Sequence, residues 1–189
     1  MNTDGFALVD PHPRFHRSFL AAADEFVAAG EDRHANLLSW PADETFEGVT
    51  FTREALESAE QFARFTGFLL DQRREDAPRP AVFVPYTDLW ITDGADEYVG
   101  RLSVRHRLTD VLLTWGGHIG YAVRPSARRR GYATRALAAA LPICAELAID
   151  SVLVTCDVDN EASRRTIEHN GGVYEDTREG KLRYWVPTT

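Results

Sequence analysis

Two strands joined through a helix, between His118 and Val158, restrict the fold more than any other feature of this sequence. The segment LLTWGGHIGYAVR has the apolar pattern of a strand, and VLVTCDV is a short β-branched run typical of a buried strand. Helix-forming residues fill most of the interval between them. A strand, a helix and a second strand in this order form a right-handed parallel crossover. We therefore expect a sheet that contains at least one parallel pair of strands.

The other elements are predicted from periodicity and from the positions of glycine and proline. The segment TDLWITDGADEYVGRLSVRHRL predicts an antiparallel hairpin that turns around Asp93 and Gly94. Residues 31–50 are expected to form a loop, with a short helix as an option. Helices are predicted from about Phe15 to Ala29, from about Thr52 to Arg73 and in DNEASRRTIEHNGG, and further strands at FALVD, around Val173 and from Arg183 to Val186. This order predicts an α/β (α+β) fold with a central mixed, mostly antiparallel sheet of six or seven strands and flanking helices.

Composition and charge argue against several classes of protein. With 189 residues, 44% of them hydrophobic and 11% aromatic, the chain has room for one domain with a substantial core. A net charge of −8 argues against a protein whose main task is to hold nucleic acid. The N-terminus lacks the pattern of a secretory signal, and the longest apolar segment is broken by Pro142 and Glu146. We expect a soluble cytoplasmic protein without a membrane segment, and without a metal, because Cys144 and Cys156 have no metal-ligand spacing.

The segment VRPSARRRGYATRAL places three arginines and a glycine between a strand and a helix. Backbone N–H groups at the start of a helix lack intrahelical partners, and together with the helix dipole they attract anions. Arg128, Arg129 and Arg130 add positive charge, and Gly131 lets the backbone approach a ligand closely. The patterns GxxxxGK(S/T) and GxGxxG are absent, so a pyrophosphate bound without a magnesium motif is the favoured ligand. The alternative is a solvated basic turn.

The same segment resembles the acetyl-coenzyme-A loop of the GNAT N-acetyltransferase superfamily, R/Q-x-x-G-x-G/A between a strand and a helix. Arg128, Gly131 and Ala133 fill its three fixed positions, and DNEASRRTIEHNGG is similar to a second family segment downstream. The predicted order of elements is similar to that of GNAT proteins from about Phe6 to Val186. The stretch GGHIGYAVRPSARRRGYAT also resembles a less-characterised bacterial branch with a GHIGY-type strand before the loop. The resemblance implies one GNAT domain over residues 1–189, with an enlarged helical N-terminal part at about 14–75.

The resemblance also implies that acetyl-CoA (coenzyme A carrying an acetyl group) is the co-substrate, and where it binds. In this family the strand before the loop splays from its parallel neighbour and binds the pantetheine arm through its backbone, here at Ala122 and Val123. Asn160 and Ser163 match positions that contact the coenzyme from the other side of the splay. The pyrophosphate site is implied to comprise Arg128 and the backbone N–H groups of Arg129, Arg130, Gly131, Tyr132, Ala133 and Thr134.

The implied reaction is direct transfer of the acetyl group to a primary amine of a small molecule or peptide in a ternary complex. His118 is the candidate base, because it lies on the strand before the loop and a histidine has an unperturbed pKa of about 6.5. Alternatively, His118 only bonds a backbone group within the sheet. His106, as a lining of the acceptor pocket, and Asp157 are reserve candidates, and each is otherwise structural. The N–H of Val123 is the expected oxyanion donor.

One position departs from the family pattern. Many GNAT enzymes carry a tyrosine seven residues after the asparagine and use it to protonate the leaving thiolate, whereas this chain has Ile167 there. Either another group such as Tyr132, Tyr174 or water supplies the proton, or none is needed. The second option is chemically reasonable, because a thiol with a pKa of about 8.5 leaves as the thiolate.

Two other functions stay open from the sequence. One is a non-catalytic module that binds or senses acyl-CoA. The other is a nucleic-acid-binding protein that uses Arg124, Arg135 and the three loop arginines, which the net charge disfavours. Small amines, amino acids, aminoglycoside-like compounds and protein N-termini all remain as acceptors, with the acidic composition mildly favouring a cationic one. The oligomeric state is open, with a homodimer among the options.

Overall fold

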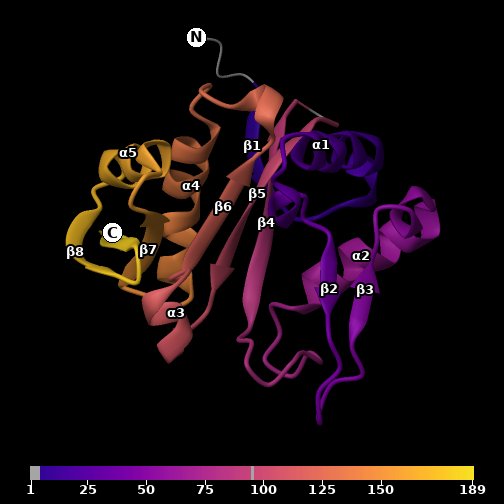
Figure 1. Cartoon of the computed structure of the whole chain (residues 1–189), viewed down its shortest axis with the longest axis horizontal. Coiled ribbons are helices and arrows are strands. Elements are labelled where there is room, and N and C mark those ends of the chain that lie inside the picture. The colour runs from indigo at the N-terminus through magenta and orange to yellow at the C-terminus, as the bar shows by residue number, and fades with distance from the viewer. Residues whose placement is uncertain (1–4, 95) are drawn as a thin grey trace.

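A seven-stranded sheet with helices on both faces forms the body of the molecule in the computed structural model, which describes residues 5–94 and 96–189 (Figure 1). The strand order is β1-β4-β5-β6-β7-β9-β8, in which β6 and β7 run parallel and the other neighbours antiparallel. The strands are β1 (Phe6–Val9), β4 (Tyr86–Asp93), β5 (Tyr98–Arg105), β6 (Ile119–Val123), β7 (Ser151–Asp157), β8 (Val173–Arg178) and β9 (Lys181–Pro187). The predicted mixed, mostly antiparallel sheet with a parallel pair is therefore confirmed.

The longer helices are α1 (His16–Ala28), α2 (Ala59–Asp71), α4 (Tyr132–Glu146) and α5 (Glu161–His169), and short 3₁₀ turns are η1 (Pro13–Phe15), η2 (Asp32–His34), η3 (Ala55–Glu57) and η4 (Pro125–Ala127). Figure 1 shows α4 and α5 to the left of β6, and α1 and α2 to its right. None of the helices within the described ranges is long and apolar enough to cross a bilayer.

The two faces of the sheet carry separate hydrophobic clusters. Along β4, Leu89 and Ile91 belong to the cluster that includes α4, whereas Trp90 between them belongs to the cluster on the opposite face. This is the alternation expected of a strand that is covered on both sides. Trp90 packs there against Phe19 of α1 and Phe62 of α2, with ring centroids 5.2 Å and 6.0 Å away. Both clusters therefore depend on the same central strands.

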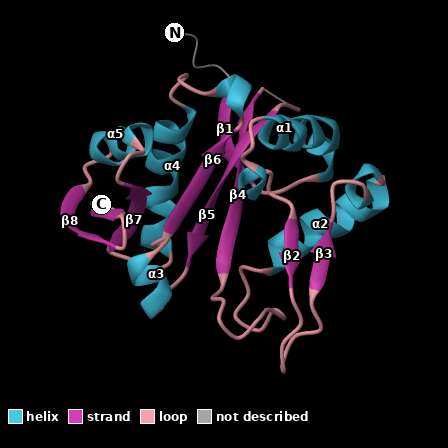
Figure 2. Cartoon of the chain, in the orientation of Figure 1, coloured by secondary structure: helices cyan, strands magenta, loops and turns pink. Residues whose placement is uncertain are grey.

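Three short elements differ from the expectations drawn from the sequence. Residues 31–50, expected to be mainly loop, contain the strands β2 (Leu38–Trp40) and β3 (Val49–Phe51), which pair with each other beside α2 (Figure 2). Phe51 of this hairpin packs against Phe65 of α2. The strand expected to start at Leu112 starts instead at Ile119, because the first residues form α3 (Asp110–Thr114). The side chain of Thr109 caps α3 by accepting a hydrogen bond from the N–H of Leu112 at 3.3 Å.

The parallel strands β6 and β7 separate toward their carboxyl ends. Ile119 pairs with Val154, and no later described residue of β6 pairs with β7. β6 nevertheless stays paired with β5 as far as Val123, and β7 stays paired with β9 as far as Asp157. Each strand keeps its ladder with its outer neighbour, so the backbone groups that face the gap have no strand partner.

Candidate active site

The loop between β6 and α4 presents a row of unbonded backbone N–H groups. Gly131 precedes α4 with a φ of 79°, a left-handed conformation that glycine adopts without strain. Among the described residues, none accepts a backbone hydrogen bond from the N–H groups of residues 129–134. The next N–H along the chain, that of Arg135, donates to the Gly131 oxygen at 3.1 Å. These donors lie at the positive end of a helix, so they suit an anion with several acceptor oxygens, such as a pyrophosphate.

Arg124 and Ser126 at the start of this loop are held by Glu25 of α1. Arg124 is buried and pairs with Glu25 at 2.5 Å and also with Glu97. The N–H and the hydroxyl of Ser126 both donate to Glu25 at 3.0 Å. Burial alone would raise the pKa of Glu25, but the hydrogen bonds from Arg124 and Ser126 outweigh it and lower this pKa to about 2. Glu25 therefore stays ionised at neutral pH and ties the loop to α1.

Two further carboxylates hold the arginines that the sequence assigned to an anion. Arg128 pairs with Glu31 at 2.5 Å, and Arg130 pairs with Asp93 at 3.0 Å. Asp93 also accepts a hydrogen bond from the hydroxyl of Tyr132. The side chains of Arg128 and Arg130 thus serve as anchors in this structure, and the N–H groups beside them remain available.

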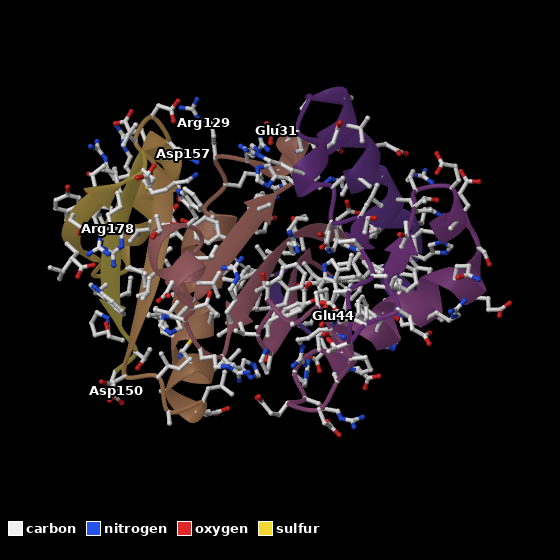
Figure 3. All side chains as sticks on the ribbon, turned by 60° about the horizontal axis from the view of Figure 1, so that its bottom comes forward. Glu31, Glu44, Arg129, Asp150, Asp157 and Arg178 are labelled. Atoms are coloured by element: carbon white, nitrogen blue, oxygen red, sulfur yellow. The ribbon has the colours of Figure 1, made fainter. Side chains whose placement is uncertain are left out.

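Arg129 lies between these anchors and forms no ion pair with any residue in the described part of the chain. Its φ of 61° is unusual for a residue that has a Cβ atom. Figure 3 shows Arg129 at the same end of the molecule as Glu31 and Asp157, with Asp150 at the opposite end. Because Asp157 ends β7, the loop and the open end of the gap lie together.

A pocket of about 380 Å³ opens where β6 and β7 separate. Its walls include three residues from each of the two strands, namely Ile119, Gly120, Tyr121, Thr155, Cys156 and Asp157. Trp115 and Gly116, which precede β6, also line it. The pocket therefore lies directly beside the backbone of the splayed pair.

Residues at the start of α5 face β6 across the gap. The phenol oxygen of Tyr121 lies 2.8 Å from the hydroxyl oxygen of Ser163, and burial raises the pKa of Tyr121 to about 12. The side chain of Asn160 caps α5 by accepting a hydrogen bond from the N–H of Ser163 at 3.0 Å. Asn160 and Ser163 both line the pocket, so the structure brings this pair to the same cavity as β6.

The β5–β6 ladder decides which backbone groups of β6 face the gap. The N–H of Arg124 donates to the Val99 oxygen at 2.8 Å, and the alternation of an antiparallel pair then directs the backbone of Ala122 toward β5. The N–H groups of Tyr121 and Val123 point the other way, into the gap. Of the two residues expected to bind the pantetheine arm through their backbone, Val123 faces the gap, and Tyr121 faces it in place of Ala122.

His118 is buried and does not line the pocket. Its Nδ1 accepts a hydrogen bond from the N–H of Leu153 at 2.9 Å, and its ring packs edge-on against Trp185. Burial, with a smaller contribution from the charge of Arg105, lowers the pKa of His118 to about 4. This arrangement corresponds to the alternative that the sequence left open, a histidine bonded to the backbone within the sheet.

The reserve candidates His106 and Asp157 have different surroundings. The Nε2 of His106 lies 2.9 Å from the hydroxyl of Thr87, outside the pocket, and burial lowers the pKa of His106. Asp157 lines the pocket, where its carboxylate pairs with Lys181 of β9. The structure therefore brings Asp157, but not His106, to Asn160 and Ser163.

Several pocket residues were not identified from the sequence, among them Arg33, His34 and Arg105. Arg33 and His34 belong to η2, and Arg105 ends β5. Burial, followed by the charge of Arg33, lowers the pKa of His34, so that its ring is neutral at pH 7. No local motif marks these residues, because Arg33 and His34 reach the pocket only when η2 folds onto the sheet, and Arg105 reaches it only when β5 pairs with β6.

The cysteines and acidic groups show no sign of a metal centre. Cys144 and Cys156 are both free and buried, and burial raises the pKa of Cys144 to about 11. In residues 5–94 and 96–189, no group of three or more His, Cys, Asp or Glu side chains could hold a metal ion.

Comparisons with known proteins agree with this geometry. A family model described as an acetyltransferase (GNAT) domain matches residues 26–173. A ribosomal-protein-S5-alanine acetyltransferase from Vibrio fischeri is 12% identical, with a TM-score of 0.63 over 100% of this chain and 96% of its own. RimJ from Mycobacterium smegmatis, in complex with CoA-disulfide, is 18% identical, with a TM-score of 0.62 over 96% of this chain and 81% of its own. The microcin C7 self-immunity acetyltransferase MccE, in complex with acetyl-CoA and AMP, is 14% identical, with a TM-score of 0.60 over 98% of this chain and 93% of its own. No curated protein matches the sequence.

The chain belongs to the GNAT acetyltransferase family. The matched region runs from α1 through the splayed strands to the start of β8, and so includes the loop, the gap and the pocket. At 18% identity or less, these solved structures add the shared fold and leave the acceptor open.

Proposed function

We propose that this protein transfers an acetyl group from acetyl-CoA to a primary amine of a small molecule or peptide within a ternary complex. The observation that carries the proposal is the meeting of three features at one edge of the sheet. These are the unbonded N–H groups of residues 129–134, the gap between β6 and β7, and the pocket beside it. Neighbours in the fold comparison include RimL, named as a ribosomal L7/L12 alpha-N-protein acetyltransferase, which supports an amine as the acceptor.

The chain would hold acetyl-CoA mainly through its backbone. The N–H groups of residues 129–134 bind the pyrophosphate, and Arg129 adds an unpaired positive charge. The N–H groups of Tyr121 and Val123 bind the pantetheine arm in the gap, which Asn160 and Ser163 border on the other side. Acetyl-CoA supplies the activated acetyl thioester, and the N–H of Val123 stabilises the oxyanion that develops during transfer.

His34 is the base in this proposal. An amine must lose its proton before it can attack a carbonyl carbon, and His34 combines a place in the pocket wall with a neutral ring. The Nε2 of His34 accepts a hydrogen bond from the Nε of Arg33 at 3.2 Å, an exposed contact that the amine would have to replace. The earlier candidate His118 stays a prediction, but its Nδ1 is occupied by the N–H of Leu153. Asp157 is already paired with Lys181.

Tyr121 is the group placed to protonate the leaving thiolate. Tyr132 bonds Asp93 in the loop, and Tyr174 is exposed on β8, where its hydroxyl lies 2.8 Å from that of Thr177. Tyr121 lines the pocket and reaches α5 at Ser163, one turn before Ile167. The phenol of Tyr121 on β6 would thus protonate the leaving thiolate, a role that the family pattern gives to a tyrosine on α5.

The pH dependence of kcat, measured at saturating acceptor, tests the assignment of the base. Because the pKa of His34 lies below 6.5, we expect kcat to fall only as the pH drops below 6.5. His34→Asn should lower kcat by about a hundredfold and remove this dependence, whereas His106→Asn, outside the pocket, is the matched control. A decline near pH 4 that disappears in His118→Asn would assign the base to His118 instead. Saturable acetyl-CoA binding without thiol release over a broad panel of amines would indicate a non-catalytic binding module.

A further inference from the structure

Arg105 is a pocket residue whose positive charge has no carboxylate partner among the described residues. Its Nη1 donates to the carbonyl oxygens of Gly116 and Gly117 at 3.0 Å and 3.1 Å. No carboxylate of the described residues lies within ion-pair distance of it, and no described residue accepts a hydrogen bond from its Nε or Nη2. Asp88, a buried carboxylate on β4, lies 3.9 Å from Arg101 instead. The guanidinium therefore has donors left over on the side that lines the pocket.

Two glycines, Gly116 and Gly120, lie beside this guanidinium. A Cβ atom added at Gly120 would lie 3.4 Å from Nη2 and 3.5 Å from Nη1 of Arg105, and one at Gly116 would lie 3.5 Å from Nη1. The planar group thus lies beside β6 and the turn before it, at ordinary van der Waals distance from an added Cβ atom. The glycine between them in the sequence, Gly117, is required for a different reason, because a Cβ atom there would clash with the carbonyl oxygen of Leu153.

The surroundings make the charge of Arg105 unusual. Burial lowers the pKa of Arg105, and the neighbouring charge of Arg101 acts in the same direction. A cation taken out of water is costly unless a hydrogen-bonded counter-charge compensates it, and two carbonyl oxygens compensate only part of that cost. Arg33 lines the same pocket, whereas Lys181 and Asp157 neutralise each other. In a chain with a net charge of −8, this pocket has an excess of positive charge.

We propose that Arg105 binds an anionic group of the acceptor, so that the amine acetylated by this protein also carries a carboxylate or a phosphate. The inference rests on the proposed acetyl transfer and names its substrate class. A guanidinium presents parallel N–H donors that match both oxyanions. Since Gly120 and Tyr121 line the pocket beside Arg105, the bound anion would keep the amine next to the splayed strands. The preference is opposite to the cationic acceptor that the overall composition favours.

Steady-state kinetics with matched acceptors test this proposal. Acetyl-CoA-dependent transfer is measured for glycine against glycinamide, and for O-phosphoethanolamine against ethanolamine, which separate a carboxylate from a phosphate as the anion. Glycinamide has the less basic amine, so a larger fraction of it is unprotonated and reactive at neutral pH. We expect kcat/KM for at least one anionic acceptor to exceed that of its neutral partner by about tenfold or more, mainly through a lower KM.

Two variants identify Arg105 as the origin of the preference. Arg105→Gln should reduce the anionic-to-neutral ratio of kcat/KM by about tenfold or more. Arg105→Lys keeps the charge but loses the parallel N–H donors of the guanidinium, so it should retain part of the preference for anionic acceptors. Acetyl-CoA affinity and thermal unfolding establish that each variant is folded.

The outcomes separate this inference from the proposed function. Transfer to neutral amines as good as to anionic ones in the wild type, or an equal loss for all acceptors in Arg105→Gln, would overturn the anion site and leave acetyl transfer standing. The second result would make Arg105 a structural clamp on the turn at Gly116 and Gly117. Failure to acetylate any amine would overturn both proposals.

Discussion

At the scale of single residues, Asp88 on β4 is a buried carboxylate that accepts no hydrogen bond from any side chain or backbone group of the described residues. The guanidinium of Arg101 is 3.9 Å away from it. Burial is the largest influence and raises the pKa of Asp88 to about 6, although the charge of Arg101 opposes it. At neutral pH the folded protein therefore holds a carboxylate that water would solvate better in the unfolded chain.

We expect Asp88→Asn to stabilise the protein at neutral pH. Because the pKa of Asp88 is about 6 in the folded state and about 3.8 without burial, the folded state binds this proton more tightly, and stability falls as the pH rises through that interval. Above it, the substitution should add on the order of 2 kcal/mol to the free energy of unfolding, and below it the difference should vanish. Thermal unfolding of both proteins at pH 7 and pH 4 measures the effect. A variant less stable than the wild type at pH 7 would show that Asp88 is needed to hold Arg101.

Some residues of the site could be identified from the sequence, and others could not. The loop is marked by local pattern, since Arg128, Gly131 and the following helix are contiguous, and the structure leaves its N–H groups unbonded. The partners of the loop arginines are not marked, because Glu25 and Glu31 lie about a hundred positions earlier in the chain. From the sequence, the side chains of Arg128 and Arg130 were expected to bind the anion, whereas in the structure carboxylates of the protein neutralise their charge. His34 and Arg105 escaped notice for the same reason, since only tertiary packing brings them to the pocket.

At the scale of elements, α4 contains Pro142 on its exposed side. Proline has no N–H to bond the carbonyl of the preceding turn, and its ring crowds that carbonyl. We expect Pro142→Ala to raise the free energy of unfolding by about 1–3 kcal/mol, measured by denaturant titration. Acetyl-CoA affinity should stay at the wild-type value, because Pro142 lies several turns away from the start of α4. A loss of stability would mean that the proline sets a helix shape on which the core depends.

Elements with a clear period were predictable, and those too short to show one were not. The helices α1, α2, α4 and α5 and the central strands β4, β5 and β7 each bury one or both faces, which leaves a repeating apolar pattern in the sequence. By contrast, β2 and β3 have three residues each, which is fewer than two full periods of a strand. The five residues of α3 include only three apolar ones in a row, which fit a strand as well as a helix, and the helix is capped by the side chain of Thr109.

At the scale of the whole molecule, both core clusters are built on the same strands. Leu89 and Ile91 of β4 serve the cluster with α4, while Trp90 of β4 and Tyr98 of β5 serve the cluster with α1 and α2. We expect the chain to unfold in one cooperative transition, because neither cluster can be lost without disturbing strands that the other needs. Tryptophan fluorescence and far-ultraviolet circular dichroism should then give coincident denaturant curves. Two separate transitions would show that the helical part at about 14–75 forms a unit of its own.

The binding of acetyl-CoA tests the central claim most directly, by calorimetric titration into the wild type and into Ala133→Glu. Ala133 lies in the first turn of α4, where a glutamate suits the helix dipole and so should preserve the fold while its charge opposes a pyrophosphate. We predict micromolar binding to the wild type, about −8 kcal/mol, weakened by about tenfold or more in the variant. No saturable binding to the wild type, or equal binding by both proteins, would contradict the assignment of this loop to the coenzyme.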